Sequence, residues 1–140
     1  MKNLTTTSKW GYCALSADFL HIGHLKYMKR CKEYCEKLYV GIMSDECILD
    51  YKKAKPIQTC YEREEVIRGL KIVNGTFIQN TFEFPEFVLR LSKRKGMHVF
   101  DSTEHNREGA TMVFDRHNGI SSTLLKKAHD ESTDYSKCPL

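Results

Sequence analysis

Two histidines that flank Ile22 and Gly23 form the most chemically suggestive group in the chain. The segment reads ALSADFLHIGHLKYM, and His21 and His24 lie where an apolar run gives way to a helical pattern. Unpaired N–H groups give a helix N-terminus partial positive charge, which favours phosphate. Gly23 allows a ligand close to the backbone, and imidazoles can donate hydrogen bonds to phosphoryl oxygens. Capping of a turn by both histidines is the alternative, but HxGH at a strand-to-helix junction favours phosphate binding.

A second group of cations lies downstream, in a lysine-rich segment and at the start of a predicted helix. Lys52, Lys53 and Lys55 fall in the stretch LDYKKAKPIQ, and Arg63 falls in the first turn of the next helix. A cation at that position is unfavourable for the helix itself. Arg63 is therefore expected either to pair with a carboxylate such as that of Glu46 or to face a bound anion.

A third group is the segment DRHNGISST at residues 115–123, which precedes the last predicted helix. It offers Arg116, a flexible Asn-Gly turn and hydroxyl groups at a helix N-terminus. Ser121 acting only as a helix cap, with Ile120 as a hydrophobic staple, is the simpler interpretation. Considered together, the three groups predict donor-rich helix starts on one edge of one sheet, which is the arrangement of a polyphosphate site.

The elements that must position these groups follow from apolar periodicity. Strand-like segments are expected at 10–15, 38–43, 75–79, 97–100 and 111–114. Helix-like segments are expected at 23–37, 59–73, 85–95 and 121–128, with residues 49–58 as a loop. In the second helix, Thr59 and Glu62 form a capping box, and Val66 and Ile67 are expected to face inward.

This alternation predicts an α/β, Rossmann-like three-layer sandwich with a mostly parallel sheet of about five strands. Ligands bind such sheets beyond the carboxyl ends of the strands. We expect residues 1–9 to be an N-terminal extension, residues 10–128 a single domain and residues 129–140 a polar tail.

Composition excludes several other classes of protein. The net charge of +4 comes without a basic stripe interleaved with aromatic residues, so we expect no nucleic-acid partner. No stretch approaches the roughly 20 apolar residues that cross a bilayer, and the first residues do not resemble a signal peptide. A cytoplasmic location is therefore expected. The six cysteines show no metal-ligand spacing, so we expect free thiols and no protein-built metal site.

Three motifs follow one another along the chain: HxGH, the lysine loop followed by Glu-Arg, and RxxGISST. Their order resembles that of the small cytidylyltransferases of the HxGH nucleotidyltransferase superfamily. The glycerol-3-phosphate cytidylyltransferase type is most similar in length and motif order. The resemblance extends from Trp10 to Ala128. One departure is informative, because the usual GxFD is replaced here by LSAD, which keeps only Asp18. The ALSAD-HxGH variant resembles the branch associated with phosphoenolpyruvate mutase, some of whose members act on phosphonates.

The resemblance implies a role for each matched residue. His21 and His24 would contact the triphosphate, Lys52 or Lys55 would hold phosphates, and Arg63 would bind the acceptor. Asp101 is the nearest match to a glycine-aspartate loop that helps to hold the nucleotide. The full set of implied nucleotide-binding residues is Ser16, Ala17, Asp18, Gly23, Asp101, Arg116, Gly119, Ile120, Ser121, Ser122 and Thr123.

The implied reaction joins CMP from CTP to a small phosphate- or phosphonate-bearing acceptor and releases pyrophosphate. The resemblance also implies a Mg²⁺ ion that bridges the CTP phosphates, and a homodimer. An adenylyltransferase of the same superfamily is one alternative, because HxGH also serves ATP-dependent enzymes. A non-catalytic nucleotide-binding protein is the other.

Overall fold

The fold is a five-stranded, all-parallel sheet with the strand order β3-β2-β1-β4-β5. A computed structural model describes residues 7–115 of the chain. Its elements are β1 Ser8–Leu15, α1 Ile22–Lys32, β2 Cys35–Met43, α2 Asp45–Lys52, α3 Cys60–Arg68, β3 Gly75–Gln79, α4 Glu86–Lys95, β4 His98–Ser102 and β5 Met112–Phe114. The predicted α/β, Rossmann-like fold is therefore confirmed.

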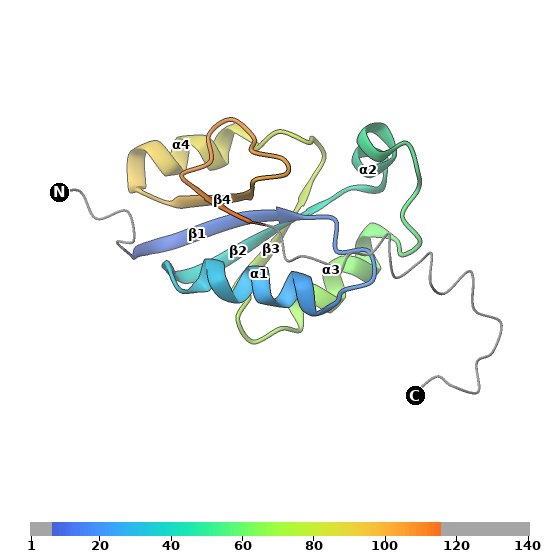
Figure 1. Cartoon of the computed structure of the whole chain (residues 1–140), viewed down its shortest axis with the longest axis horizontal. Helices are drawn as coiled ribbons and strands as arrows, with labels where there is room; N and C mark the ends of the chain where they lie inside the picture. The colour runs from blue at the N-terminus through green and yellow to red at the C-terminus, as the bar shows by residue number, and fades with distance from the viewer. Residues whose placement is uncertain (1–6, 116–140) are drawn as a thin grey trace.

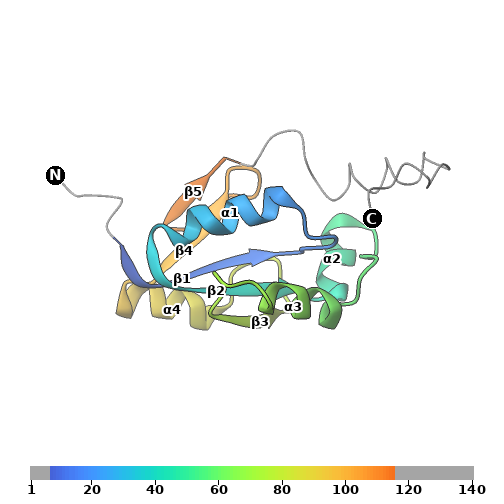
Figure 2. The same ribbon diagram turned by 90° about the horizontal axis from the view of Figure 1, so that it is seen from below.

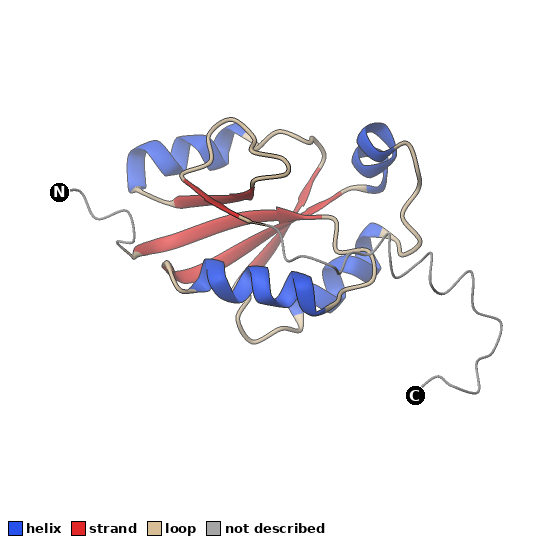
Figure 3. Cartoon of the chain, in the orientation of Figure 1, coloured by secondary structure: helices blue, strands red, loops and turns tan. Residues whose placement is uncertain are grey.

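The helices form layers on the two faces of the sheet (Figure 1). The chain passes from β1 through β2 to β3 with α1 and α3 on one face, and it returns through α4 on the other face (Figure 1). Seen from below, β1 and β2 lie between α1 and α4 (Figure 2). Helix α2 follows the carboxyl end of β2, as the coloured elements of Figure 3 show. Because β2 and β4 flank β1 on opposite sides, the strand order reverses between β1 and β4, where such sheets bind ligands.

The period-two alternation of side chains divides the apolar residues between two cores. Cys13 and Phe100 belong to the core beneath α1 and α3. Their neighbours Ala14 and Val99 belong to the core beneath α2 and α4. Both faces of the central strands are thus buried, which explains why these strands read as continuous apolar runs.

Several helix boundaries differ from those predicted. Helix α1 ends at Lys32, and Cys35 lies in β2, where it pairs in parallel register with Ser8. The four-residue spacing of Cys31 and Cys35 suggested one helix face, but tertiary pairing places Cys35 in the sheet. The pairing also places the start of β1 at Ser8, within the expected N-terminal extension.

Helix α2 occupies part of the segment expected to be a loop. The Ser44 hydroxyl accepts a hydrogen bond from the backbone N–H of Cys47 at 3.2 Å, which caps the helix. Lys53 ends it in the left-handed conformation at φ 60°. The capping box of α3 is confirmed, because Thr59 and Glu62 bond reciprocally. The inward position predicted for Val66 is wrong, since this side chain is 43% exposed.

The buried cysteines behave as small apolar residues. Cys13, Cys31, Cys35, Cys47 and Cys60 are buried with free thiols, as predicted for these positions. Burial raises the pKa of Cys35 to about 11 and also raises the pKa values of the Cys31, Cys47 and Cys60 thiols. Thiols that stay protonated are poor nucleophiles, so these thiols contribute packing rather than chemistry.

Candidate active site

A cavity of about 570 Å³ opens at the carboxyl edge of the sheet, across the point where the strand order reverses. Its walls come from the end of β1, the first half of α1, the end of α2 and the segment that follows β4. The lining side chains and backbone are those of Ala14, Leu15, Ser16, His21, Gly23, His24, Tyr27, Met43, Tyr51, Lys52, Ala54, Asp101, Ser102, Glu104, His105 and Arg107. Such a crevice is the expected ligand site of this fold.

The two histidines cap α1 and line the cavity at the same time. Nδ1 of His21 accepts a hydrogen bond from the backbone N–H of Gly23 at 3.0 Å, and Nδ1 of His24 accepts one from the N–H of His21 at 3.1 Å. The ring centroids lie 4.0 Å apart. A neutral imidazole whose Nδ1 accepts carries its proton on Nε2. Each ring can therefore act as a donor through Nε2 while its Nδ1 stabilises the helix start.

The N-terminus of α1 adds partial positive charge to this wall. The helix has 11 residues and no acidic side chain in its first turn. Gly23, in that first turn, is buried and lines the cavity. An anion placed here gains from the helix dipole and from the imidazole donors together.

A tyrosine and a lysine from α2 form the opposite side of the cavity. The Tyr51 hydroxyl shares a hydrogen bond with the Ser16 hydroxyl at 3.1 Å, and burial raises the pKa of Tyr51. The Nζ atom of Lys52 lies 5.8 Å from the centroid of the Tyr51 ring. Lys52 is the last residue of α2 and is exposed, so its charge lies at the mouth of the cavity.

A buried ion pair joins Asp101, near the end of β4, to Arg107 in the segment that follows this strand. The Asp101 carboxylate accepts hydrogen bonds from the backbone N–H groups of Ser102 at 2.8 Å and Arg107 at 2.6 Å, and from Nη1 of Arg107 at 3.2 Å. His105 lies in the same segment, and burial together with the charge of Arg107 lowers its pKa. His105 is therefore neutral at neutral pH, so Arg107 and Lys52 supply the fixed positive charge on this side.

Asp18 and Arg63 lie outside the cavity wall, contrary to what the resemblance implied. Arg63 is fully buried and donates to the carbonyl groups of Ser16, Met43 and Gln58 at 2.7–3.1 Å. Its Nη2 pairs with Asp45 at 2.6 Å, so the carboxylate alternative holds, with Asp45 as the partner in place of Glu46. These contacts leave Arg63 a structural role.

Asp18 fixes the loop between β1 and α1. Its carboxylate accepts the backbone N–H groups of Ile57 and Gln58, each at 2.9 Å. Ala17 and Phe19, on either side, have φ values of 57° and 61°. Positive φ is unfavourable for residues with a Cβ, so the tether from Asp18 is needed to hold this conformation. The loop places Ser16 and His21 at the cavity although Ala17 and Asp18 do not line it.

The predicted residues thus divide into three groups. Ser16, His21, Gly23, His24, Lys52 and Asp101 line one cavity, whereas Ala17, Asp18, Lys55 and Arg63 do not. Arg116, Gly119, Ile120, Ser121, Ser122 and Thr123 lie outside the described residues, as does the helix predicted at 121–128.

Sequence reasoning missed the lining residues Tyr51, Glu104, His105 and Arg107. The position of residues 104–107 could have indicated three of them, because this segment follows a strand whose carboxyl end meets the predicted ligand edge.

Among residues 7–115, no group of three or more histidine, cysteine or acidic side chains could hold a metal ion. No helix in the same range has the length and apolar character needed to cross a membrane.

The sequence is similar to one protein family and to several curated proteins. The cytidylyltransferase-like family model matches residues 16–100. FAD synthase from Thermococcus sibiricus is 38% identical over 61 residues, which cover 44% of this chain and 41% of that protein. The bifunctional protein HldE from Campylobacter concisus is 40% identical over 130 residues, covering 86% of this chain and 27% of that protein. The chain therefore spans less than half the length of these curated relatives.

A solved structure supports the fold. The lipopolysaccharide core biosynthesis protein from Thermoplasma volcanium superposes with a TM-score of 0.61 at 16% identity, covering 78% of this chain and 98% of that one. At this identity the likeness concerns the fold alone. The family match covers more than half of the 140 residues, and the chain therefore belongs to the cytidylyltransferase-like family.

Proposed function

We propose that the chain is a nucleotidyltransferase that joins CMP from CTP to a small acceptor bearing a phosphate or phosphonate group. The observation that carries this proposal is the histidine pair, which caps α1 and lines a cavity at the switch point of the sheet. Membership of the cytidylyltransferase-like family supports it.

The proposed step forms one bond and breaks one. An anionic oxygen of the acceptor attacks the α-phosphorus of CTP, the bond from that phosphorus to the β-phosphate oxygen breaks, and pyrophosphate leaves with the electron pair. The nucleophile is already ionised, so no general base is needed. The protein must align two anions that repel each other and stabilise the charge that moves onto the leaving group.

Three of the lining residues are suited to this task. His21 and His24 would donate from Nε2 to the triphosphate, and the N-terminus of α1 would add its dipole. Lys52, at the cavity mouth, would offset charge on the phosphates. The segment from Arg116 to Thr123 is proposed from sequence alone to hold the nucleotide.

Mg²⁺ would accompany the triphosphate in this proposal. The Asp101 carboxylate is already bonded to N–H groups of Ser102 and Arg107, which makes it a poor ligand for the ion. The described residues therefore fit an ion that takes its oxygen ligands from phosphate and water. The ion would neutralise phosphate charge.

Adenylyl transfer is the second candidate, favoured by the similarity to FAD synthase. FAD contains an adenine nucleotide, so a related chain could accept ATP in place of CTP. The geometry of the histidine pair serves either triphosphate, because it addresses the phosphates and not the base.

Pyrophosphate release tests both candidates. Purified protein with Mg²⁺ is assayed with CTP or ATP against glycerol 3-phosphate, phosphocholine and 2-hydroxyethylphosphonate. CTP-dependent release that requires an acceptor supports the proposal, and ATP-dependent release supports the second candidate. Binding of CTP without release under every condition would contradict catalysis and favour a nucleotide-binding protein. The homodimer and the cytoplasmic location stay predictions.

A further inference from the structure

We propose that one edge of the Arg107 guanidinium receives the dianionic phosphate or phosphonate group of the acceptor. This inference rests on the proposed function, because it divides the cavity between a nucleotide and a second anion. Arg107 lines the cavity, and its side chain is only 1% exposed.

The guanidinium of Arg107 is only partly satisfied. Nη1 bonds to Asp101, but Nε and Nη2 are buried and have no hydrogen-bond partner among the described residues. Buried donors without an acceptor are unfavourable and rare in folded proteins. A ligand that brings acceptor oxygens to these atoms would remove this penalty.

The two unpartnered atoms are the matching pair for an oxyanion. In arginine, Nη1 lies on the side of Cδ, so the N–H groups of Nε and Nη2 point the same way along one edge. Two parallel donors on one edge fit two oxygens of a phosphate or phosphonate. Asp101 occupies Nη1 and leaves this bidentate edge unused.

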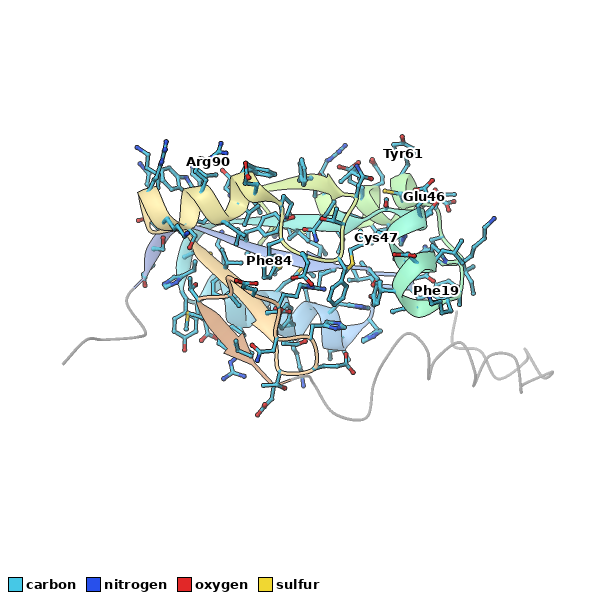
Figure 4. All side chains as sticks on the ribbon, turned by 90° about the horizontal axis from the view of Figure 1, so that it is seen from above. Phe19, Glu46, Cys47, Tyr61, Phe84 and Arg90 are labelled. Carbon is cyan, nitrogen blue, oxygen red and sulfur yellow. The ribbon has the colours of Figure 1, made fainter. Side chains whose placement is uncertain are left out.

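The guanidinium is held in a fixed orientation by aromatic rings. Its carbon Cζ lies 4.3 Å from the centroid of Phe82 and 5.3 Å from that of Phe84. Phe84 lies in the interior, whereas Tyr61 and Arg90 point outward (Figure 4). A donor edge fixed in this way loses little conformational entropy when a ligand binds.

We assign the acceptor, rather than the triphosphate, to the Nε and Nη2 edge of Arg107, because the histidine pair and Arg107 come from opposite faces of the sheet. The histidine pair lies at the start of α1, which packs on one face of the sheet. Arg107 stacks on Phe82 and Phe84, which belong to the core on the other face. Two anions that must meet but repel each other are best held by donors from opposite walls.

The test measures binding of methylphosphonate, a probe that carries only the dianionic head. It is titrated by calorimetry into the full chain, with and without α,β-methylene-CTP and Mg²⁺ to fill the nucleotide site. The main variant is Arg107→Met with Asp101→Asn, which leaves no buried carboxylate unpaired. Arg107→Lys keeps the charge but lacks the two-donor edge, and Arg90→Met removes an exposed charge as the control.

We expect the double variant to bind methylphosphonate at least about tenfold more weakly, because two charge-assisted hydrogen bonds are lost. Arg107→Lys, which leaves Asp101 in place, is expected to fall between it and the wild type and to keep its affinity for the CTP analogue. Circular dichroism confirms folding, and Arg107→Lys provides the measurement if the double variant does not fold.

Two results would overturn the inference. One is a wild type that does not bind methylphosphonate, or variants that bind it as tightly as the wild type. The other is an equal loss of affinity for the CTP analogue in Arg107→Lys, which would assign the edge to the triphosphate. A wild type that binds methylphosphonate but neither CTP nor ATP would contradict the proposed function and leave the anion site standing.

Discussion

Two buried arginines at the same edge of the sheet differ in how their hydrogen bonds are used. Arg63 is fully buried, and its guanidinium bonds to three backbone carbonyl groups and to the Asp45 carboxylate. Arg107 is also buried, but among the described residues its guanidinium bonds through Nη1 alone, to Asp101, and Nε and Nη2 have no partner. Each of the three guanidinium nitrogens of Arg63 thus donates a hydrogen bond to the protein.

Residues at this edge of the sheet therefore divide into a group that stabilises the fold and a group that lines the cavity. The Arg63 region, with Asp18, joins the loop after β1 to the segment before α3. Arg107 and the histidine pair both line the cavity, and Nε and Nη2 of Arg107 have no hydrogen-bond partner among residues 7–115. Variants of the first region should change stability, whereas variants of the second should change turnover or affinity.

The largest effect is expected for Arg63→Met. Three carbonyl groups would lose their donor inside the protein, so the free energy of unfolding should fall by about 3 kcal/mol. Urea denaturation measures this loss. Arg68→Met, in the same helix but with an exposed side chain, should change it by less than about 0.5 kcal/mol. An equal response of the two variants would contradict a structural role for Arg63.

His24→Asn should lower turnover about a hundredfold and leave the protein folded. Loss of one preorganised donor raises the activation free energy by about 3 kcal/mol. The asparagine oxygen can still accept the N–H of His21 and keep the cap. His24→Ala also loses the cap, so it should be less stable by about 1 kcal/mol at a similar turnover. Near-normal turnover in either variant would remove His24 from the mechanism.

Asp18→Asn should have an intermediate effect. The amide group replaces one acceptor oxygen with a donor that faces a backbone N–H, so the unfolding free energy should fall by about 2 kcal/mol. Affinity for CTP should fall as well, because the loop that places His21 loosens. Asp50→Asn, at an exposed position of α2, is the matched control. Calorimetry of CTP binding with thermal unfolding measures both effects.

The smallest effect is expected from His105, whose pKa burial and Arg107 lower. The folded chain therefore releases this proton more readily than the unfolded chain does. The stability that His105 contributes is present above the ordinary histidine pKa of about 6.5 and is lost as the pH falls below it. Urea denaturation between about pH 5 and 7.5 should show a shallower decline for His105→Gln. An unchanged pH profile would contradict this assignment.

Much of the fold could be predicted because its signals are local. The apolar run at residues 38–43 and the capping box at Thr59 predicted β2 and α3. Helix α2 was missed because the lysines and Pro56 dominated the interpretation, although Ser44 followed by Asp45 and Glu46 is itself a helix start. The sequence alone does not show whether the helix start or the loop pattern decides the structure of such a segment.

Site residues could be predicted only where the residues that act together are close to one another in the sequence. The HxGH segment both caps a helix and lines the cavity, so its spacing carried the information. The role of Arg63 depends on carbonyl groups up to 47 residues away along the chain, which no sequence pattern reports. Arg107 resembled an ordinary loop residue, because its burial depends on aromatic rings from the segment between β3 and α4.

The location of bound CTP is the most direct test of the account. In a ¹⁵N-labelled chain, Mg²⁺ and CTP should shift the backbone signals of Ser16, Gly23, His24 and Ser102 at the cavity. The basic face of α4, with Arg90 and Lys93, should stay unchanged. Shifts confined to α4, with the histidine segment unaffected, would contradict the claim that this edge binds the triphosphate.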